Sequence, residues 1–560
     1  MKTRGQFRNM FMLFCLFALC GCSKHFLDTK IDIYATPQTI ITDRATLFGF
    51  ANAFYVDLPN GFNALDNNLF AAATDDGQQT AQYSTTALLF NQGGLNPNSI
   101  NMDAGSGFYK KMYDGIRAAN FFLDYSTDYV AFLSLNRDTI NEITNYTKDK
   151  LYIHWYRGEA HIARAFYYAQ LIKRYGGVPL ITQTLKNANH IDVPKASYQE
   201  VVDFIISEID QYTDSLQQDW KSSAYSDQEG RFTQGAALAL KARVLLYDAS
   251  PLHNPENDLT KWRNAAAAAD QVIALQRYSL DPNYGDYFTG DHALSSNETI
   301  FAIRQPAGNT PERLNYPIST PGGNSGMTPT QNLVSAYENL GYADPNNPYV
   351  NRDPRLAATI VLNGSTWNGR TIDESLGGSD DMTKPNTSRT GYYLKKFLTD
   401  NLNLVQNGTA RHPWVVFRYA EILLDYAEAM NEAYGPDDNN GYSLTARQAL
   451  QMVRDRASNN LANVTALSKD DFRTAVKHER RVELAFEGHR YWDLLRWKDA
   501  ESILNKSVMG VRVTKNTNGS FNYQEVQVAD RVFTQAMYYF PFSQSEIVNS
   551  GHVLIQNPGY

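Results

Sequence analysis

Cysteine is almost absent from this 560-residue chain, and its few copies are confined to one end. The three cysteines are Cys15, Cys20 and Cys22. Beyond position 22 the chain can therefore form no disulfide, no cysteine zinc site and no cysteine nucleophile. Any fold in the remaining length must be stabilised by a buried core, which a chain of this size can supply.

Catalytic signatures are also missing. The sequence contains no HExxH pattern, no GxSxG nucleophile elbow and no Walker-type phosphate loop. The ten histidines are scattered, and His478 and His489 stand about three helical turns apart, too far to share one metal ion. We therefore predict a protein that is not an enzyme and that holds no cofactor, with a structural calcium ion as the one alternative. A glycoside hydrolase stays an alternative, because its carboxylate pair has no local motif.

The first 22 residues have the pattern of an export signal followed by a lipid-attachment site. Basic residues precede an apolar run at positions 10–19, which is too short to span a bilayer. The next residues, LCGCS, resemble a bacterial lipobox. This motif predicts that residues 1–21 are a signal peptide and that Cys22 is acylated, for example with palmitate. Cys20 fits less well, because Leu19 would then occupy a position that needs a small residue. An ordinary secretory leader is the alternative.

Positive charge is scarce relative to negative charge. The chain has 51 Lys and Arg against 59 Asp and Glu, a formal net charge of −8. An acidic chain without a long basic run is a poor nucleic-acid binder, so we expect no nucleic-acid partner. Aromatic residues are abundant instead, with 35 Tyr, 28 Phe and 7 Trp. Many must be core, but rings on loops also suit the flat C–H faces of sugars.

Helical patterns dominate both ends of the chain. Apolar spacing predicts helices over residues 43–56, 107–125, 139–175, 198–216, 234–247, 261–275, 415–433, 443–457 and 469–498. Residues 281–411 are dense in Gly, Asn, Pro, Ser and Thr, with a strand-like piece at 299–303. The sequence thus predicts a mainly α fold with helical parts at 22–280 and 412–560, and an irregular, loop-rich lobe with a few short strands at 281–411. Loose Ala/Tyr patterns in the helices favour a helical-repeat scaffold.

The segment 477–498 has the most ordered charge pattern. Arg480, Glu483, Glu487 and Arg490 lie three or four positions apart, with mostly opposite signs adjacent, so they can pair along a helix. We expect an internal helix held by ion pairs. The alternative is a catalytic carboxylate site at Glu483 and Glu487, which the nearby arginines disfavour because they keep both groups ionised.

A set of short motifs recurs along nearly the whole chain after residue 21. They are CSKHFLD at 22–28, the stretch 158–180 ending in RYGGVPL, RDPRL at 352–356, FRYAE at 417–421, YAEA at 426–429, ERR at 479–481, RW at 496–497 and QNPGY at 556–560. Together these motifs resemble the SusD/RagB family of outer-membrane nutrient-capture lipoproteins. Each motif alone is weak, whereas the combination is highly specific.

The resemblance implies one domain over residues 22–560, built from about four tetratricopeptide-like helix pairs with the lobe packed on them. It also implies a non-catalytic lipoprotein of the cell outer membrane, anchored through lipid at Cys22 and facing the cell surface. Such a protein would bind a glycan or oligosaccharide and deliver it to a partner SusC-like TonB-dependent transporter. The alternatives are a surface glycoside hydrolase and a peptide-binding uptake protein of the RagB type.

Two loop regions hold side chains suited to a sugar, which needs ring platforms and polar groups on loops carried by a rigid scaffold. In the lobe, Trp367 stands among Gly, Ser, Thr and Asn, so it is predicted to be a ligand platform; the alternative is a ring that plugs the lobe against a helix. In residues 60–105, Asp75 and Asp76 are predicted to contact ligand or a structural calcium ion. The alternative is that their carboxylates cap the backbone of the loop. The ligand-binding candidates are Trp367, Tyr316, Tyr83, Asp75, Asp76 and Asn68.

Overall fold

The computed structural model describes residues 41–98, 107–185, 193–221, 224, 226–342, 344 and 346–560. The predicted signal peptide and Cys22 lie outside the described residues. Within the described chain, residues 41–50 and 125–150 form a small compact unit, and residues 51–124 and 151–560 form a large one. The domain boundaries expected from the sequence stay a prediction.

The small unit consists of α3 (Arg44–Phe50), α6 (Tyr129–Ser134) and the first part of α7 (Ile143–Tyr175). An ion-pair cluster stabilises it. Asp149 on α7 accepts hydrogen bonds from Arg44 Nε at 2.6 Å and from Arg137 Nη1 at 2.7 Å. One carboxylate thereby joins three segments of this unit.

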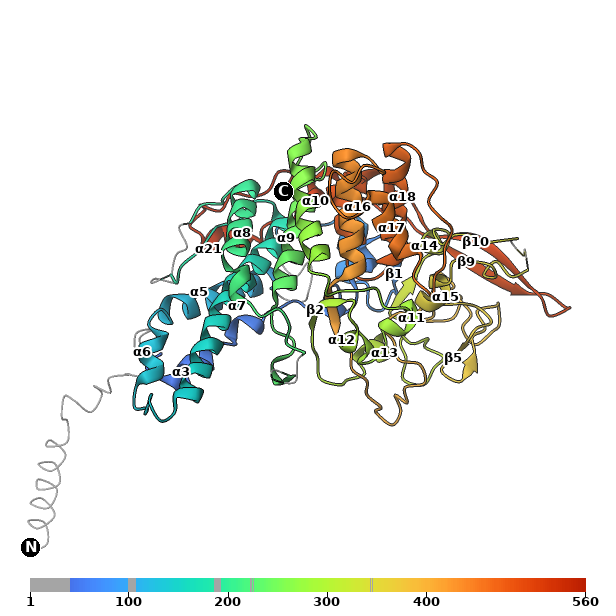
Figure 1. Ribbon diagram of the computed structural model, residues 1–560. Coiled ribbons are helices and arrows are strands. Elements are labelled where there is room, and N and C mark those ends of the chain that lie inside the picture. The colour runs from blue at the N-terminus through green and yellow to red at the C-terminus, as the bar shows by residue number, and fades with distance from the viewer. Residues whose placement is uncertain are drawn as a thin grey trace, which may run out of the picture. The chain divides into compact units, whose positions relative to one another are not determined.

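The large unit is mainly helical, as the sequence predicts. Its long helices after α7 are α8 (Tyr198–Tyr212), α9 (Gln234–Ala249), α10 (Leu259–Ala274), α16 (Tyr419–Tyr434), α17 (Ala446–Arg454) and α18 (Lys469–Glu483), and α5 (Phe108–Tyr125) precedes them. Neighbouring helices α8, α9, α10 and α16 pack in that order, and α17 and α18 both pack on α16 (Figure 1). Helix α5 joins the array through a hydrogen bond from Arg164 on α7 to Asn120, and an ion pair between Arg454 and Glu479 links α17 to α18.

Small residues bring these helices close together. A Cβ on Gly115 of α5 would stand 2.3 Å from the ring of Tyr167 on α7, so only glycine fits there. In α10, Ala265, Ala266 and Ala269 are at most 2% exposed and lie in the seam with its neighbours. The Ala/Tyr pattern of the sequence therefore corresponds to close helix packing.

The irregular lobe is inserted between α10 and α16, two helices that pack on each other. The chain leaves the array at the end of α10 and returns at the start of α16, through β2 (Thr299–Ile303) and β8 (Trp414–Arg418), which pair antiparallel. The expected helix at 415–433 was wrong over its first four residues, because strand pairing with β2 takes those residues. The predicted strand at 299–303 is confirmed.

The lobe contains many short elements around an aromatic core. They are α11 (Tyr284–Tyr287), α12 (His292–Ser295), α13 (Thr310–Asn315), β3 (Met327–Pro329), α14 (Gln331–Val334), α15 (Arg355–Thr359), β4 (Ile360–Val361), β5 (Thr366–Trp367), β6 (Arg370–Thr371) and β7 (Tyr393–Leu394). Strand β4 pairs with β7, β5 with β6, and β3 with β1 (Gly77–Gln79) of the early loop. Six tyrosines of the lobe are at most 2% exposed: Tyr284, Tyr287, Tyr316, Tyr337, Tyr392 and Tyr393.

The continuous helix expected through 469–498 is interrupted. Helix α18 ends at Glu483, and α19 (Arg490–Arg496) begins after a six-residue break. Within the break Phe486 has φ 65° and Gly488 has φ 80°, left-handed values that no α-helix contains. The expectation of one helix was therefore wrong, although both halves are buried as predicted.

The remaining elements complete the large unit. They are α4 (Thr86–Asn91), α20 (Ala500–Ile503), β9 (Val508–Lys515), β10 (Phe521–Ala529), α21 (Gln544–Asn549) and the 3₁₀ turns η1 (Ala53–Tyr55), η2 (Gly61–Asn63), η3 (Phe70–Ala73), η4 (Thr213–Ser215), η5 (Ser226–Gln228) and η6 (Gln535–Tyr538). Strands β9 and β10 form an antiparallel hairpin that extends away from the rest of the large unit (Figure 1). Over the described residues, no helix combines the length and apolarity that a bilayer span requires.

Candidate functional site

Glu483 and Glu487 lie in a buried ion-pair network rather than in an open site. Glu483 is fully buried at the end of α18, and its carboxylate contacts Arg355, Arg418 and Arg456 at 2.8–2.9 Å. Burial alone would raise the pKa of Glu483, but these three positive charges outweigh it and lower the pKa. Glu487 binds Arg418 Nε at 2.6 Å. Both carboxylates are thus paired with cations, which favours the structural interpretation over catalysis.

The network joins separate parts of the large unit. Arg418 at the end of β8 binds Glu487 and Glu483, and it also binds Glu298, which precedes β2, at 2.7 Å. From the lobe, Lys396 Nζ donates to Glu487 Oε1 at 2.7 Å and to the carbonyl oxygen of Ala485 at 2.9 Å. The break between α18 and α19 therefore places backbone and carboxylate acceptors where the lobe docks.

Asp75 and Asp76 belong to a second ion-pair cluster. Arg490 on α19 donates to both oxygens of Asp75 at 3.0 Å, and Arg481 on α18 reaches Asp75 at 2.8 Å and Asp76 at 2.7 Å. Burial would raise the pKa of Asp75, but the two guanidinium charges prevail and lower it. Arginine nitrogens thus contact both oxygens of Asp75 and Oδ1 of Asp76, while Asp76 Oδ2 has no hydrogen-bond partner among the described residues. A ligand or calcium contact at these two residues stays a prediction.

Asn68 is buried and makes a reciprocal amide pair. Its Nδ2 donates to Asn315 Oδ1 at 2.7 Å, and its Oδ1 accepts from the backbone N–H of Leu69 at 2.9 Å. Only 2% of Asn68 is exposed. The amide thus links the early loop to α13 of the lobe and presents no group at the surface.

Trp367 and Tyr316 pack against each other inside the lobe. Their rings meet edge to face with centroids 6.1 Å apart, and they are 3% and 0% exposed. Trp367 ends β5, ahead of a two-residue turn in which Asn368 and Gly369 both have positive φ. The Tyr316 hydroxyl donates to the carbonyl oxygen of Thr399. Both rings are therefore buried, and the ligand role predicted for them stays a prediction.

Tyr83 is the one sequence candidate with a partly exposed side chain. It lies in a turn in which its backbone N–H donates to the Thr80 carbonyl oxygen at 3.0 Å. Partial burial raises the pKa of its hydroxyl. The six candidates do not converge on one site: the first loop and the lobe touch through Asn68, but Asp75 and Asp76 turn toward α18 and α19.

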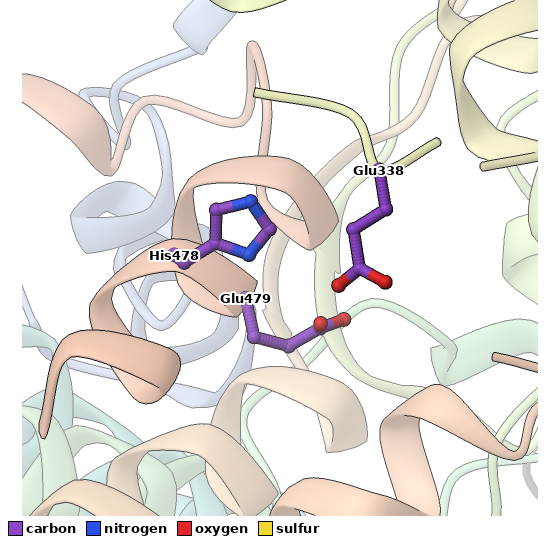
Figure 2. A group of neighbouring side chains, drawn as sticks. All are labelled: Glu338, His478 and Glu479. Atoms are coloured by element: carbon purple, nitrogen blue, oxygen red, sulfur yellow. The ribbon is translucent and has the colours of Figure 1, made fainter. Parts of the chain in front are cut away.

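A possible metal cluster is occupied by an arginine. Figure 2 shows Glu338 from the lobe beside His478 and Glu479 of α18, with the two carboxylates facing each other. Arg454 Nη1 donates to Glu338 Oε1 at 2.7 Å and to Glu479 Oε2 at 2.8 Å, and it lowers the pKa of Glu338. His478 Nε2 is 2.7 Å from the carbonyl oxygen of Ala336, which can only accept, so this nitrogen carries the proton. A guanidinium thus supplies the positive charge that these carboxylates need.

A groove in the large unit has the open, mixed surface that the sequence candidates lack. It encloses about 330 Å³ and is lined by residues 218–221, 229–233, 277–278 and 294–304. These segments come from the connection between α8 and α9, the end of α10 and the first part of the lobe with β2. This volume is at the lower end of the range for small-ligand pockets, about 300–1,000 Å³.

Aromatic rings form part of the groove wall. Tyr278 is half-buried, and its hydroxyl end rests on α9, where a Cβ on Gly235 would come within 1.9 Å of the oxygen. Trp220 Nε1 donates to the carbonyl oxygen of Phe232 at 3.0 Å, which holds its ring in place. Arg231 lies 4.2 Å from the Trp220 ring centroid and is ion-paired with Glu159 at 2.7 Å. The wall is therefore rigid, with the Tyr278 ring at its accessible side.

Polar side chains surround this aromatic wall. Gln218, Asp219, Lys221, Arg277, Asn297 and Arg304 are exposed and line the same groove. An aromatic wall with amide, carboxylate and cationic groups at its rim is suited to a ligand with C–H faces and hydroxyls. Sequence analysis missed this site, because its residues come from four segments and Tyr278 lies just ahead of the predicted lobe. A Trp among polar residues, as in QQDWK at 217–221, was the available signal.

Two family models match most of the chain. The model of the SusD family matches residues 293–560, and a SusD-like model described as "Starch-binding associating with outer membrane" matches residues 25–246. Among curated proteins, SusD-like protein P38 of Formosa agariphila is 28% identical over 371 residues, 62% of this chain and 67% of that protein. A SusD-like protein of Bacteroides ovatus is 25% identical, over 68% of this chain and 67% of its own length.

Solved structures agree with these matches. A SusD-like protein from Bacteroides fragilis superposes with a TM-score of 0.74 at 25% identity, over 93% of this chain and 98% of that one. A SusD-like carbohydrate-binding protein from the same organism gives 0.74 at 22% identity, over 92% and 100%. A laminarin-binding SusD-like protein gives 0.65 at 22% identity, over 93% and 100%. The last two likenesses establish the fold alone.

Proposed function

The chain belongs to the SusD/RagB family, and from that premise we propose that it is a non-catalytic outer-membrane lipoprotein that binds a glycan. The groove beside Tyr278 is the proposed binding site. The observation that carries this proposal is the combination, in one hollow, of an accessible aromatic ring with exposed amide and cationic side chains. Similar proteins described as carbohydrate-binding and laminarin-binding support the ligand class.

The membrane anchor and the partner complete the proposal. Cys22 carries the lipid that holds the protein at the outer membrane, facing the cell surface. A SusC-like TonB-dependent transporter receives the glycan from it. The lipobox and the family membership support both statements.

The absence of catalysis is also part of the proposal. Two carboxylates line the groove, and neither stands free: Glu229 is ion-paired with Arg304 at 2.5 Å, and Asp219 Oδ1 accepts the backbone N–H of Lys221 at 2.8 Å. A glycosidase needs one carboxyl group that donates a proton and a second that acts as base or nucleophile. Ion pairing and loop capping leave this pair poorly suited to both roles.

Calorimetric titration of residues 23–560 against a panel of polysaccharides and peptides tests the proposal. A glycan should bind saturably and be recovered uncut. Tyr278→Ala should weaken that binding about tenfold or more, the effect typical of an aromatic anchor. Tyr342→Ala is the matched control, because Tyr342 is 82% exposed and lies outside the groove. Cleavage of the glycan would indicate a hydrolase, and binding of peptide alone would indicate uptake of the RagB type.

A further inference from the structure

The charge of the groove is opposite in sign to that of the whole chain. The chain carries a formal net charge of −8. Cationic side chains nevertheless outnumber acidic ones along the groove: Lys221, Arg231, Arg277 and Arg304 against Asp219 and Glu229. A local excess of one sign attracts ligands of the other sign and raises their local concentration.

Two of the four cations are already neutralised by carboxylates. Arg231 donates to both oxygens of Glu159, at 2.7–3.1 Å, and is buried in that pair. Arg304 Nη1 lies 2.5 Å from Glu229 Oε2. These two arginines form part of the groove wall. Because each is ion-paired with a glutamate, its charge is not available to a ligand.

The other two cations have no acidic partner among the described residues. Lys221 Nζ donates to the carbonyl oxygen of Ser296 at 3.0 Å. One N–H of the Arg277 guanidinium donates to Gln218 Oε1, which fixes the group while leaving other donors unused. Asp219 also lines the groove, but its Oδ1 caps the backbone of its own turn. Asp219 and Glu229 still attract the Lys221 ammonium at longer range, but Lys221 and Arg277 together outnumber the exposed Asp219, so the rim keeps an excess of positive charge.

We propose that Lys221 and Arg277 make this groove selective for glycans that carry an anionic group, either a carboxylate or a sulfate. The two side chains come from two segments that line the same groove, the α8–α9 connection and the end of α10, and Arg277 is held beside the first of these by its hydrogen bond to Gln218, so a sugar in the groove can meet both. A planar guanidinium binds a carboxylate or sulfate through two parallel hydrogen bonds, and the ammonium adds a point charge. This inference rests on the proposed function, since it names the ligand class of the same site.

The test is a titration of the full chain, purified in detergent, with three oligosaccharides of equal length. One is neutral, one carries uronic acids and one carries sulfate groups. Each is measured at low and high salt with the unaltered protein, with the Lys221→Met/Arg277→Gln double variant, and with Arg389→Gln. Arg389 is the matched control, because it is exposed on the lobe and lies outside the groove. Thermal unfolding of every variant checks that the fold is kept.

The expected result is at least about tenfold tighter binding of an anionic oligosaccharide than of the neutral one. The double variant should remove that difference and leave neutral binding unchanged, and added salt should weaken anionic binding alone. The uronate and sulfate titrations show which anion is preferred. Equal binding of neutral and anionic sugars, or equal loss of both in the double variant, would overturn the selectivity while the glycan-binding function stands. Binding of no oligosaccharide would overturn both.

Discussion

The Glu483 network and the groove contain the same kinds of charged residue. In the network these residues are buried and ion-paired, whereas two of them at the groove rim are exposed and make no ion pair among the described residues. In the network, Arg418, Arg456 and Arg355 surround Glu483, and each of these side chains is at most 2% exposed. At the groove rim, Lys221 and Arg277 are exposed and have no carboxylate partner within the described part of the chain. A buried ion needs its counter-ion to offset desolvation, whereas an exposed ion can exchange water for a ligand. Pairing, rather than charge density along the sequence, therefore separates scaffold from site.

The largest expected effect comes from removing the cation shared by the network. Arg418→Met should lower the free energy of unfolding by about 3–5 kcal/mol, because Glu298, Glu483 and Glu487 would lose a common buried partner. Urea unfolding measures this. Arg277→Gln at the groove rim is the control and should change stability by no more than about 0.5 kcal/mol. Equal unfolding midpoints for the two variants would contradict the distinction between buried, ion-paired arginines and exposed ones at the groove rim.

A slightly smaller loss of stability is expected from a change at Trp367. This variant tests whether a lobe residue that stabilises the fold also contributes to glycan binding. Trp367→Ala should cost about 3 kcal/mol of stability, because it removes a ring that is 97% buried against Tyr316 and leaves a cavity. Glycan affinity per folded molecule should stay unchanged. Calorimetric titration together with urea unfolding separates the two quantities, with Tyr342→Ala as the exposed control. Lost binding at unaltered stability would instead make Trp367 a ligand platform.

The smallest effect, per pH unit, is a pH dependence that arises inside the buried helices. Burial, together with the neighbouring Glu421, raises the pKa of Asp425 on α16 to about 7, although Arg480 binds its Oδ1. Between about pH 4 and pH 7 the folded chain then holds a proton that the unfolded chain has released, so stability falls as the pH rises. The slope for one proton is at most about 1.4 kcal/mol per pH unit.

Asp425→Asn should remove this contribution to the slope, because its side chain does not titrate. Urea unfolding at several pH values between 4 and 8 measures the change. Asp470→Asn, at an acidic residue that is 84% exposed on α18, is the control and should keep the original slope. An identical pH dependence in Asp425→Asn and the unaltered protein would show that Asp425 is ionised throughout the range.

Local periodicity predicted most helices and the strand at 299–303, since those features depend on neighbouring residues. It failed where distant partners decide the backbone. Residues 415–418 pair with β2, more than 100 positions earlier, and the break at 484–489 depends on left-handed residues that carry no helix-breaking signal except Gly488. Distant partners also decide the surroundings of the candidate ligand-binding residues. Asp75 looks available in the sequence, but its partner Arg490 lies 415 positions away.

The groove could not be assembled from the sequence either. Its segments are far apart in the chain and meet only because α9 and α10 pack together and β2 runs beside them. Trp220 and Tyr278 lie at helix-flanking positions that resemble ordinary core residues. Within the described chain, Lys221 and Arg277 form no salt bridge to a carboxylate, and this distinguishes the site; salt bridges between distant segments are a property of the folded chain.

The insertion of the lobe between α10 and α16 has a consequence for how such chains can diverge. Because β2 and β8 are hydrogen-bonded neighbours, the chain leaves and rejoins the array at one place, and changes of length inside the lobe cost little entropy of closure. Its outer loops can therefore be exchanged between relatives while the helices stay the same. Arg355 and Lys396 limit which lobes can be exchanged in this way. They reach from the lobe to Glu483 and Glu487, so a foreign lobe must bring a cation to each place or leave a buried carboxylate short of a partner.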